Sequence, residues 1–134
     1  MERRVTFALV PEAPSQARAA VNDALDPLPL KIREDATLLV SELITNAVRH
    51  ALGSGLPEVE LRIRRERGRI RVVVSDGGDG FEPAPRLPTA AEGSGWGLYL
   101  VDRIADRWGV LSKDRNEVWF ELDVDDDRTV SGSR

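Results

Sequence analysis

Residues 58–76 constrain the fold most, because they predict two strands joined by a tight turn. In the first strand, Val59, Leu61 and Ile63 alternate with polar residues, which is the pattern of a strand with one buried face. Residues 67–68 provide the turn, and the apolar run that follows indicates a more central strand of the same antiparallel sheet. A sheet with one apolar face needs a second layer to cover it.

Three helical patterns supply that second layer, and the strongest of them begins near Ile32. Its apolar residues recur at helical spacing over about 20 residues, with Ala36, Val40, Leu43 and Ala47 on one face. Prolines before this pattern and glycines after it mark where the helix begins and ends.

The remaining elements are shorter. Residues 17–25 predict an earlier helix with Ser15 as its N-cap, and residues 98–105 predict a later helix. Residues 4–10 and 118–124 have the composition of strands. Together the elements predict an α/β (α+β) two-layer sandwich, in which a mixed, largely antiparallel sheet is covered on one face by three helices.

A length of 134 residues fits one domain, which we expect to span residues 1–124. Trp108 and Trp119 are expected in its core or at the core edge. Residues 125–134 begin with three aspartates and are expected to form a disordered acidic tail. The chain has no cysteine and one histidine, which excludes a disulfide framework, a cysteine nucleophile and a Cys/His zinc site.

Charge and hydropathy narrow the class of partner. The chain has 19 basic and 23 acidic residues, for a net charge of -4. This balance gives no excess positive field for a phosphate backbone, so we expect no direct nucleic-acid partner. No apolar run approaches the ~20 residues of a membrane span, and the N-terminus lacks a signal-peptide core. We therefore expect a cytoplasmic protein with no membrane partner.

Three short motifs contain the residues that could carry chemistry. On the long predicted helix, Glu42, Asn46 and His50 recur every four residues and form a stripe beside the apolar face. An asparagine carbonyl is a hard oxygen ligand that suits Mg²⁺, and a glutamate one turn earlier could deprotonate a nucleophile beside that metal. An ordinary solvated helix edge would explain the same stripe.

The second motif is the D-x-G-x-G pattern of Asp76, Gly78 and Gly80 at the end of the second hairpin strand. A carboxylate at a buried strand end can accept a hydrogen bond from the amino group of a purine, and glycines let the backbone lie against the flat ring. A plain turn would account for the same three residues.

The third motif places Gly93, Gly95 and Gly97 directly before a helix, whose free amide groups can hold phosphate oxygens. Leu98 stands where the dinucleotide-binding fingerprint requires glycine, and the chain has no P-loop run. Residues 77–97 as a whole are too rich in glycine and proline for regular structure and predict a long loop, so a flexible loop is the alternative.

In this order and separation, the three motifs resemble those of the GHKL superfamily of ATP-binding domains, which have the histidine-kinase-like or Bergerat fold. SELITNAVRHA is similar to the N box, and SDGGDGFEP is similar to the first glycine box. GSGWGLYLVDRIADRWG and the later VWFEL resemble the second glycine box and the closing strand. Within the superfamily the chain is most similar to the small anti-sigma-factor serine/threonine kinases, because other members are much longer or need a separate phosphoacceptor helix.

This resemblance implies ATP and Mg²⁺ as cofactors. Asn46 would bind the Mg²⁺ that bridges the triphosphate, Glu42 would be the catalytic base toward a Ser or Thr hydroxyl, and Asp76 would fix the adenine amino group. ATP contacts are also implied for Gly78, Gly80, Gly93, Gly95, Gly97 and Leu98.

The resemblance further implies a regulatory protein that sequesters a sigma factor and phosphorylates an anti-sigma-factor antagonist protein, with a homodimer as a family-level expectation. Two departures leave the catalytic step open. Asn116 and Glu117 stand where members commonly have Gly-Thr or Thr, and a carboxylate there is expected to weaken adenine binding or change its water. No basic residue lies between Arg86 and Arg103, where some members place a lid arginine. A non-catalytic module in which ATP gates protein binding, and a degenerate fold used only for protein interaction, are therefore retained as alternatives.

Overall fold

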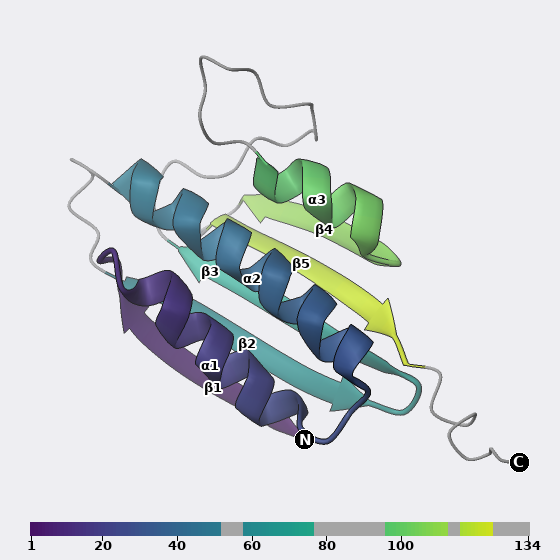
Figure 1. Cartoon of the computed structure of the whole chain (residues 1–134). Coiled ribbons are helices and arrows are strands. Elements are labelled where there is room, and N and C mark those ends of the chain that lie inside the picture. Colours follow the sequence, from purple (N-terminus) through teal and green to yellow (C-terminus); the bar gives the residue numbers. More distant parts are fainter. Residues whose placement is uncertain (52–57, 77–95, 113–115, 125–134) are drawn as a thin grey trace, which may run out of the picture.

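The computed structural model describes four segments of the chain, residues 1–51, 58–76, 96–112 and 116–124 (Figure 1). The expected loop and acidic tail therefore lie largely outside the described residues. The elements follow in the order β1 (Glu2–Ala8), α1 (Ala13–Leu25), α2 (Leu30–Ala51), β2 (Glu58–Glu66), β3 (Arg69–Asp76), α3 (Trp96–Ile104), β4 (Arg107–Ser112) and β5 (Asn116–Asp123).

The strands form one sheet with the order β1-β2-β3-β5-β4, and the three helices pack on one of its faces (Figure 1). All four strand pairings are antiparallel. The expected two-layer sandwich with a largely antiparallel sheet is thus confirmed. None of the described helices lies over the other sheet face, which is called the outer face below (Figure 1).

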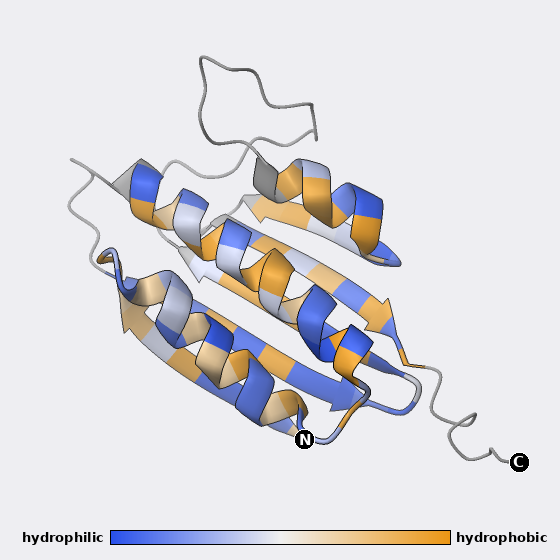
Figure 2. Cartoon of the chain, in the orientation of Figure 1, coloured by the Kyte–Doolittle hydropathy of each residue, from blue (hydrophilic) through white to orange (hydrophobic). Residues whose placement is uncertain are grey.

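The core lies between the sheet and the helices. Val59, Leu61 and Ile63 of β2 are fully buried, as their alternation predicts, and Phe120 of β5 is among the largest buried side chains. Figure 2 shows this alternation as orange and blue bands along the strands. The buried apolar residues of the helices belong to the same core cluster. The β2–β3 turn is tight, and Gly68 adopts φ +79°, a conformation that favours glycine.

Helix α2 is the longest element and spans 22 residues, close to the predicted length. Its buried residues recur every three or four positions, so the predicted apolar face packs on the sheet. Helix α1 begins earlier than predicted, at Ala13, and Glu12 occupies the N-cap position without a side-chain cap. Ser15 is therefore not the N-cap but a helical residue whose hydroxyl donates to the Glu12 carbonyl at 3.1 Å.

Strand β4 was not predicted from the sequence. It directly follows α3, and its six residues give only two apolar positions on the inner face, Trp108 and Val110, to signal a strand. Pairing with β5 stabilises it, and the Asp106 amide donates to the Glu121 carbonyl at 2.9 Å. Within the described segments, no helix is long and apolar enough to span a membrane.

Candidate functional site

The first predicted motif lies on the second half of α2. Asn46 is buried, with 8% of its surface exposed, and it lies beside the buried core residues Leu43 and Ala47. Glu42, one helical turn earlier, is half-buried. The two polar residues thus border the apolar face, as the stripe predicts. The backbone of His50 continues the helix, whereas its side chain lies outside the description.

The second motif begins where β3 ends. Asp76 is the last residue of this strand, and its backbone is paired with Val59 on β2 and with Asn116 on β5. This position is held by strands on both sides, so its backbone is fixed by the sheet. Gly78 and Gly80 lie outside the described residues, so the role proposed for this motif stays a prediction.

The third motif lies at the start of α3. The helix begins at Trp96, which makes Gly97 its second residue, and Gly93 and Gly95 lie outside the described residues. Leu98 is buried, with 5% of its surface exposed, and belongs to the hydrophobic core. Its side chain therefore stabilises α3, and an ATP contact by Leu98 stays a prediction for its backbone amide.

The fold places these motifs on neighbouring elements. Helix α2, which carries Glu42 and Asn46, contacts both α3 and β3, the elements on which the other two motifs begin or end. Figure 1 shows α2 between α1 and α3, with α3 alongside the middle of α2. Motifs that are far apart along the chain thus lie on α2 and on two elements that contact it.

The described site residues suit a metal ion that takes most of its ligands from phosphate oxygens and water. Over the part of the chain that the structure describes, no group of three or more His, Asp or Glu side chains could hold a metal ion. The amide oxygen of buried Asn46 is the one hard ligand that the sequence predicts. Mg²⁺ commonly keeps one or two protein ligands and completes its shell with phosphate oxygens and water, so these residues fit Mg-nucleotide.

The orientation of Glu117 bears on the expected effect of its carboxylate on adenine binding, which stays a prediction. Its carboxylate lies on the outer face, where Oε2 accepts a hydrogen bond from Nη2 of Arg62 at 3.2 Å. The next residue, Val118, is the one buried beneath the helices. The carboxylate is therefore directed away from the helix-covered side, and its position does not support interference with adenine binding.

The outer face carries a charged cluster that the sequence analysis missed. Glu121 is only 7% exposed, accepts a hydrogen bond from Arg107 Nε at 2.7 Å and another from Arg71 Nη1 at 2.9 Å. Burial raises the pKa of Glu121, but these hydrogen bonds and the charge of Arg69 lower it more strongly, so its pKa lies below the ordinary value. The alternation of charged with apolar residues in β3 and β5 was the available signal.

Trp119 is also part of the outer face and not of the core, contrary to expectation. The Arg71 guanidinium stacks over its ring, 4.3 Å from the centroid. Trp108 does pack at the core edge as predicted, and its Nε1 donates to Asp102 at 3.1 Å.

Two surface hollows are described, and neither is lined by the predicted site residues. One, of about 390 Å³, lies between α1 and α2. The other, of about 250 Å³, lies on the outer face and is lined by Glu2, Arg62, Arg64, Arg71 and Val73. The described residues of the predicted site thus do not by themselves form either hollow.

Comparison with known families gives a match over most of the chain. The model of the histidine kinase-like ATPase domain family matches residues 7–122. The serine-protein kinase RsbW of Bacillus velezensis is 35% identical over 92 residues, which cover 59% of this chain and 57% of that protein. RsbW of Bacillus subtilis is 35% identical over 86 residues, which cover 54% and 53%. The chain thus spans just over half the length of these relatives.

Solved structures share the fold at low sequence identity. A chain of the SiaB-SiaC complex from Pseudomonas aeruginosa superposes with a TM-score of 0.57 at 14% identity, covering 90% of this chain and 89% of that one. The histidine kinase domain of the blue-light activated kinase EL346 from Erythrobacter litoralis gives 0.56 at 20% identity, covering 90% and 64%. These similarities establish the architecture of the sheet and helices.

Proposed function

Because this chain belongs to the histidine kinase-like ATPase domain family, we propose that it binds Mg-ATP and phosphorylates a serine or threonine of a partner protein. The matched region contains all three motifs. The partially matching relatives are serine-protein kinases by name, which favours a hydroxyl of a protein as the acceptor. Family membership by itself supports the use of ATP. The acceptor hydroxyl and the transfer of phosphate to it are part of the proposal.

The observation that carries the proposal is the placement of Asn46 and Glu42 on α2. An asparagine that is 92% removed from solvent among apolar neighbours loses hydration, and a role in ligand binding explains why it stands at this position. Glu42, one turn away and half-buried, is close enough to act on the same ligand. The pair provides one oxygen ligand and one base on a single rigid element.

In the proposed reaction, Asn46 would hold the Mg²⁺, and Asp76 would accept a hydrogen bond from the adenine amino group. Glu42 takes the proton from the acceptor hydroxyl, whose oxygen forms a bond to the γ-phosphorus while the bond from that phosphorus to ADP breaks. When bound, ATP would supply the phosphoryl group, and Mg²⁺ would neutralise part of the phosphate charge. The chain itself then has to position the groups and remove one proton.

We further propose that the partners are a sigma factor, which the protein sequesters, and an anti-sigma-factor antagonist, which it phosphorylates. Homodimer formation and a cytoplasmic location belong to the same proposal. The resemblance to the anti-sigma-factor kinases supports these assignments, and the RsbW relatives are consistent with them. A net charge of -4 and the dense pairing of the arginines of the outer face with carboxylates favour protein over nucleic acid as the partner.

A module in which ATP gates protein binding without phosphate transfer is the second candidate. It is favoured by one specific feature, the lack of a basic residue between Arg86 and Arg103. Without such a cation, less of the charge that develops during transfer would be stabilised. A degenerate fold without ATP binding is the third candidate and is tested by the same first experiment.

That experiment is calorimetric titration of Mg-ATP and Mg-ADP into the wild-type protein and the Asp76→Asn variant. We expect micromolar binding by the wild type and about tenfold weaker binding by the variant, because an adenine contact is lost. Equal binding by the two proteins would remove Asp76 from the adenine site. The lack of binding at millimolar nucleotide would instead favour the degenerate fold.

A further inference from the structure

The groove between α1 and α2 is distinct from the proposed ATP site. The two helices run antiparallel along the sheet (Figure 1). A hollow of about 390 Å³ is lined by residues of both helices. It is lined by Arg18, Ala19, Asn22, Leu30, Arg33, Glu34 and Thr37. These come from the middle of α1 and the first half of α2, whereas Glu42 and Asn46 lie further along α2.

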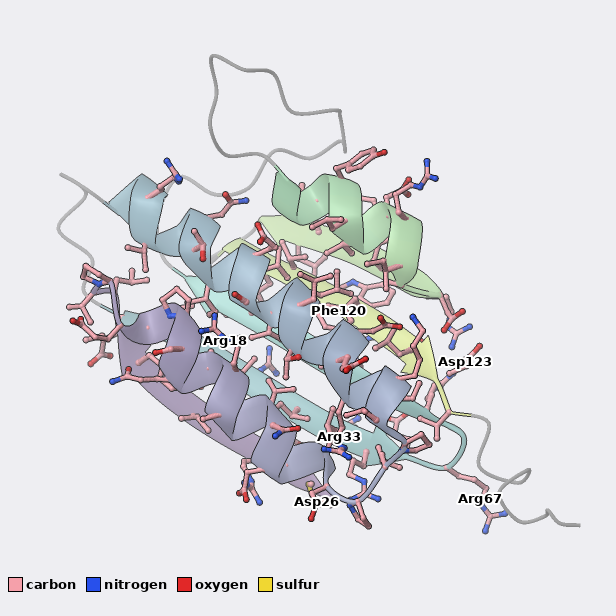
Figure 3. The ribbon with its side chains drawn as sticks, viewed as in Figure 1. Arg18, Asp26, Arg33, Arg67, Phe120 and Asp123 are labelled. Atoms are coloured by element: carbon pink, nitrogen blue, oxygen red, sulfur yellow. The ribbon has the colours of Figure 1, made fainter. Side chains whose placement is uncertain are left out.

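Two arginines in this groove have no carboxylate partner among the residues the structure describes. Arg18 Nη1 donates to the hydroxyl of Ser41 at 3.0 Å, and Arg33 Nη1 donates to the amide oxygen of Asn22 at 3.2 Å. Figure 3 shows both labelled side chains between the two helices. Their acceptors are neutral, so neither guanidinium is paired directly with a carboxylate of the described residues. Glu34 is the one carboxylate of the lining, which leaves a net charge of +1 from two cations and one anion.

The hollow on the outer face is different in this respect. Arg62, Arg64 and Arg71 line it, and each is paired with a carboxylate within 3.4 Å. Its charges are already satisfied, so it offers little to an anionic partner. Of the two described hollows, the groove between the helices is thus the one whose arginines lack a carboxylate partner among the described residues.

The groove is held in shape by the same arginine that lines it. Arg33 Nε donates to the Leu28 carbonyl at 2.9 Å, which ties α2 to the segment that connects it with α1. A guanidinium has five donors, and only two of those of Arg33 are used in these contacts. A preorganised cation loses little conformational entropy on binding, which favours a specific ligand.

Apolar surface accompanies the charge. Leu30, at the start of α2, lines the groove and is 59% exposed. Ser41, the partner of Arg18, follows Arg33 by eight residues, so the two cationic points are separated by about 12 Å along the helix axis. Carboxylates seven or eight residues apart on another helix have the same separation.

We propose that this groove docks a helix of a partner protein, which places two carboxylates about two turns apart on Arg18 and Arg33 and an apolar side chain on Leu30. An amphipathic helix that packs between two helices is a common mode of protein recognition. The charge of the groove and the spacing of its cations define the partner segment. The proposal rests on the proposed function only in assuming that the protein has a regulated partner.

The test uses the ¹⁵N-labelled full chain without nucleotide and a synthetic alanine-based helical peptide of about 16 residues. The peptide has two glutamates seven residues apart with a leucine between them, and a matched peptide has glutamines instead. We expect amide shift changes at Ala19, Asn22 and Leu30. Binding of the glutamine peptide should be about tenfold weaker, since each exposed charge contact contributes about threefold.

Variants of exposed groove residues provide the second measurement. Arg18→Gln and Leu30→Ala should each weaken binding of the glutamate peptide about threefold or more, and Ala19→Glu should weaken it further by repulsion. Arg67→Gln removes a charge from the β2–β3 turn, outside the groove, and should leave binding unchanged. Binding of Mg-ATP is measured on the same variants and should not change, which separates this proposal from the proposed function.

Two results would overturn the proposal. One is equal or undetectable binding of the two peptides at millimolar concentration. The other is a set of shift changes that lies on the outer face and is insensitive to Arg18→Gln and Ala19→Glu. Either would show that the charge of the groove does not select an acidic helix, whatever the outcome of the nucleotide titration.

Discussion

The indole ring of Trp119 occupies the space next to Gly109, its partner in the β4–β5 pairing. A Cβ on Gly109 would lie 2.7 Å from Nε1 of Trp119 and 2.9 Å from two carbons of the same ring. The Arg71 guanidinium stacks over this ring. The ring therefore lies across the outer face of β4 and packs where a larger residue at position 109 would need room.

Replacing Gly109 by alanine is expected to destabilise the protein. The added methyl group would overlap a rigid ring, and the resulting shift of Trp119 should lower the free energy of unfolding by about 1–3 kcal/mol. Urea denaturation followed by circular dichroism measures this change. The double variant Gly109→Ala, Trp119→Leu should recover most of the loss, because the ring is then absent.

Gly68→Ala is the matched control for that experiment. A Cβ on Gly68 would meet open space, but φ there is +79°, so the cost is about 1 kcal/mol of backbone strain. Trp119→Leu should not rescue this variant. If it rescued both alanine variants equally, the steric explanation for Gly109 would be wrong.

Glu121→Gln tests the charged cluster of the outer face. The pKa of Glu121 lies below its ordinary value, so its carboxylate stabilises the folded state at neutral pH, and this contribution is lost as the pH falls through the folded-state pKa. The variant should be about 1–2 kcal/mol less stable at pH 7, because an amide replaces a carboxylate that accepts charge-assisted hydrogen bonds. Denaturation curves at neutral and acidic pH measure both effects.

The sign of the pH dependence separates this prediction from a general loss of stability. The difference between wild type and Glu121→Gln should shrink in acid, where the wild-type carboxylate becomes protonated. Glu58→Gln, an exposed change on β2, serves as the control and should track the wild type at every pH. A constant difference between wild type and Glu121→Gln over the whole range would contradict the role of the carboxylate charge.

Much of the fold follows from periodicity in the sequence. The alternation in β2 and the apolar spacing of α2 predict elements that the structure confirms, since both patterns depend on which face is buried. Strand β4 does not follow, because its six residues become a strand only by pairing with β5. The prediction of Ser15 as the N-cap was wrong for a local reason. Proline at position 14 lies within the first turn, so the helix begins before Ser15.

The candidate site was predictable to a different degree. Spacing alone places Glu42 and Asn46 on one helix edge, and the structure confirms that edge. Alternation with buried Val118 also indicates that Glu117 faces away from the helices, whereas its partners Ser75 and Leu111 depend on a strand register that the sequence alone does not give. The groove between α1 and α2 was missed, because it arises from two helices that meet only in three dimensions.

The orientation of Glu117 leads to a prediction about nucleotide affinity. Its carboxylate pairs with Arg62 on the outer face, so Glu117→Gln should change the Kd of Mg-ATP by less than about twofold. Calorimetric titration at constant pH measures this, with Asp76→Asn as the comparison that loses affinity. A marked gain of affinity in Glu117→Gln would mean that the carboxylate does act on the adenine site.

Glu42→Gln should separate nucleotide binding from phosphate transfer. The amide keeps the size of the side chain but cannot accept the proton of the attacking hydroxyl, so transfer should fall by about 10²–10⁴-fold while the Kd of Mg-ATP changes little. Single-turnover transfer from radiolabelled ATP to a serine-containing antagonist protein measures the step. Glu12→Gln, an exposed change at the start of α1, should transfer phosphate at the wild-type rate.

Asn46→Ala should behave differently from Glu42→Gln. Removal of the amide oxygen should weaken binding of Mg-ATP itself, and the loss should be smaller when affinity is compared for ATP without Mg²⁺. Unchanged transfer in Glu42→Gln would eliminate this residue as the base, whereas a lack of transfer by the wild type would favour the module in which ATP gates protein binding. Loss of binding in both variants would instead indicate that the two side chains act together on the nucleotide, and the separate roles proposed here would be wrong.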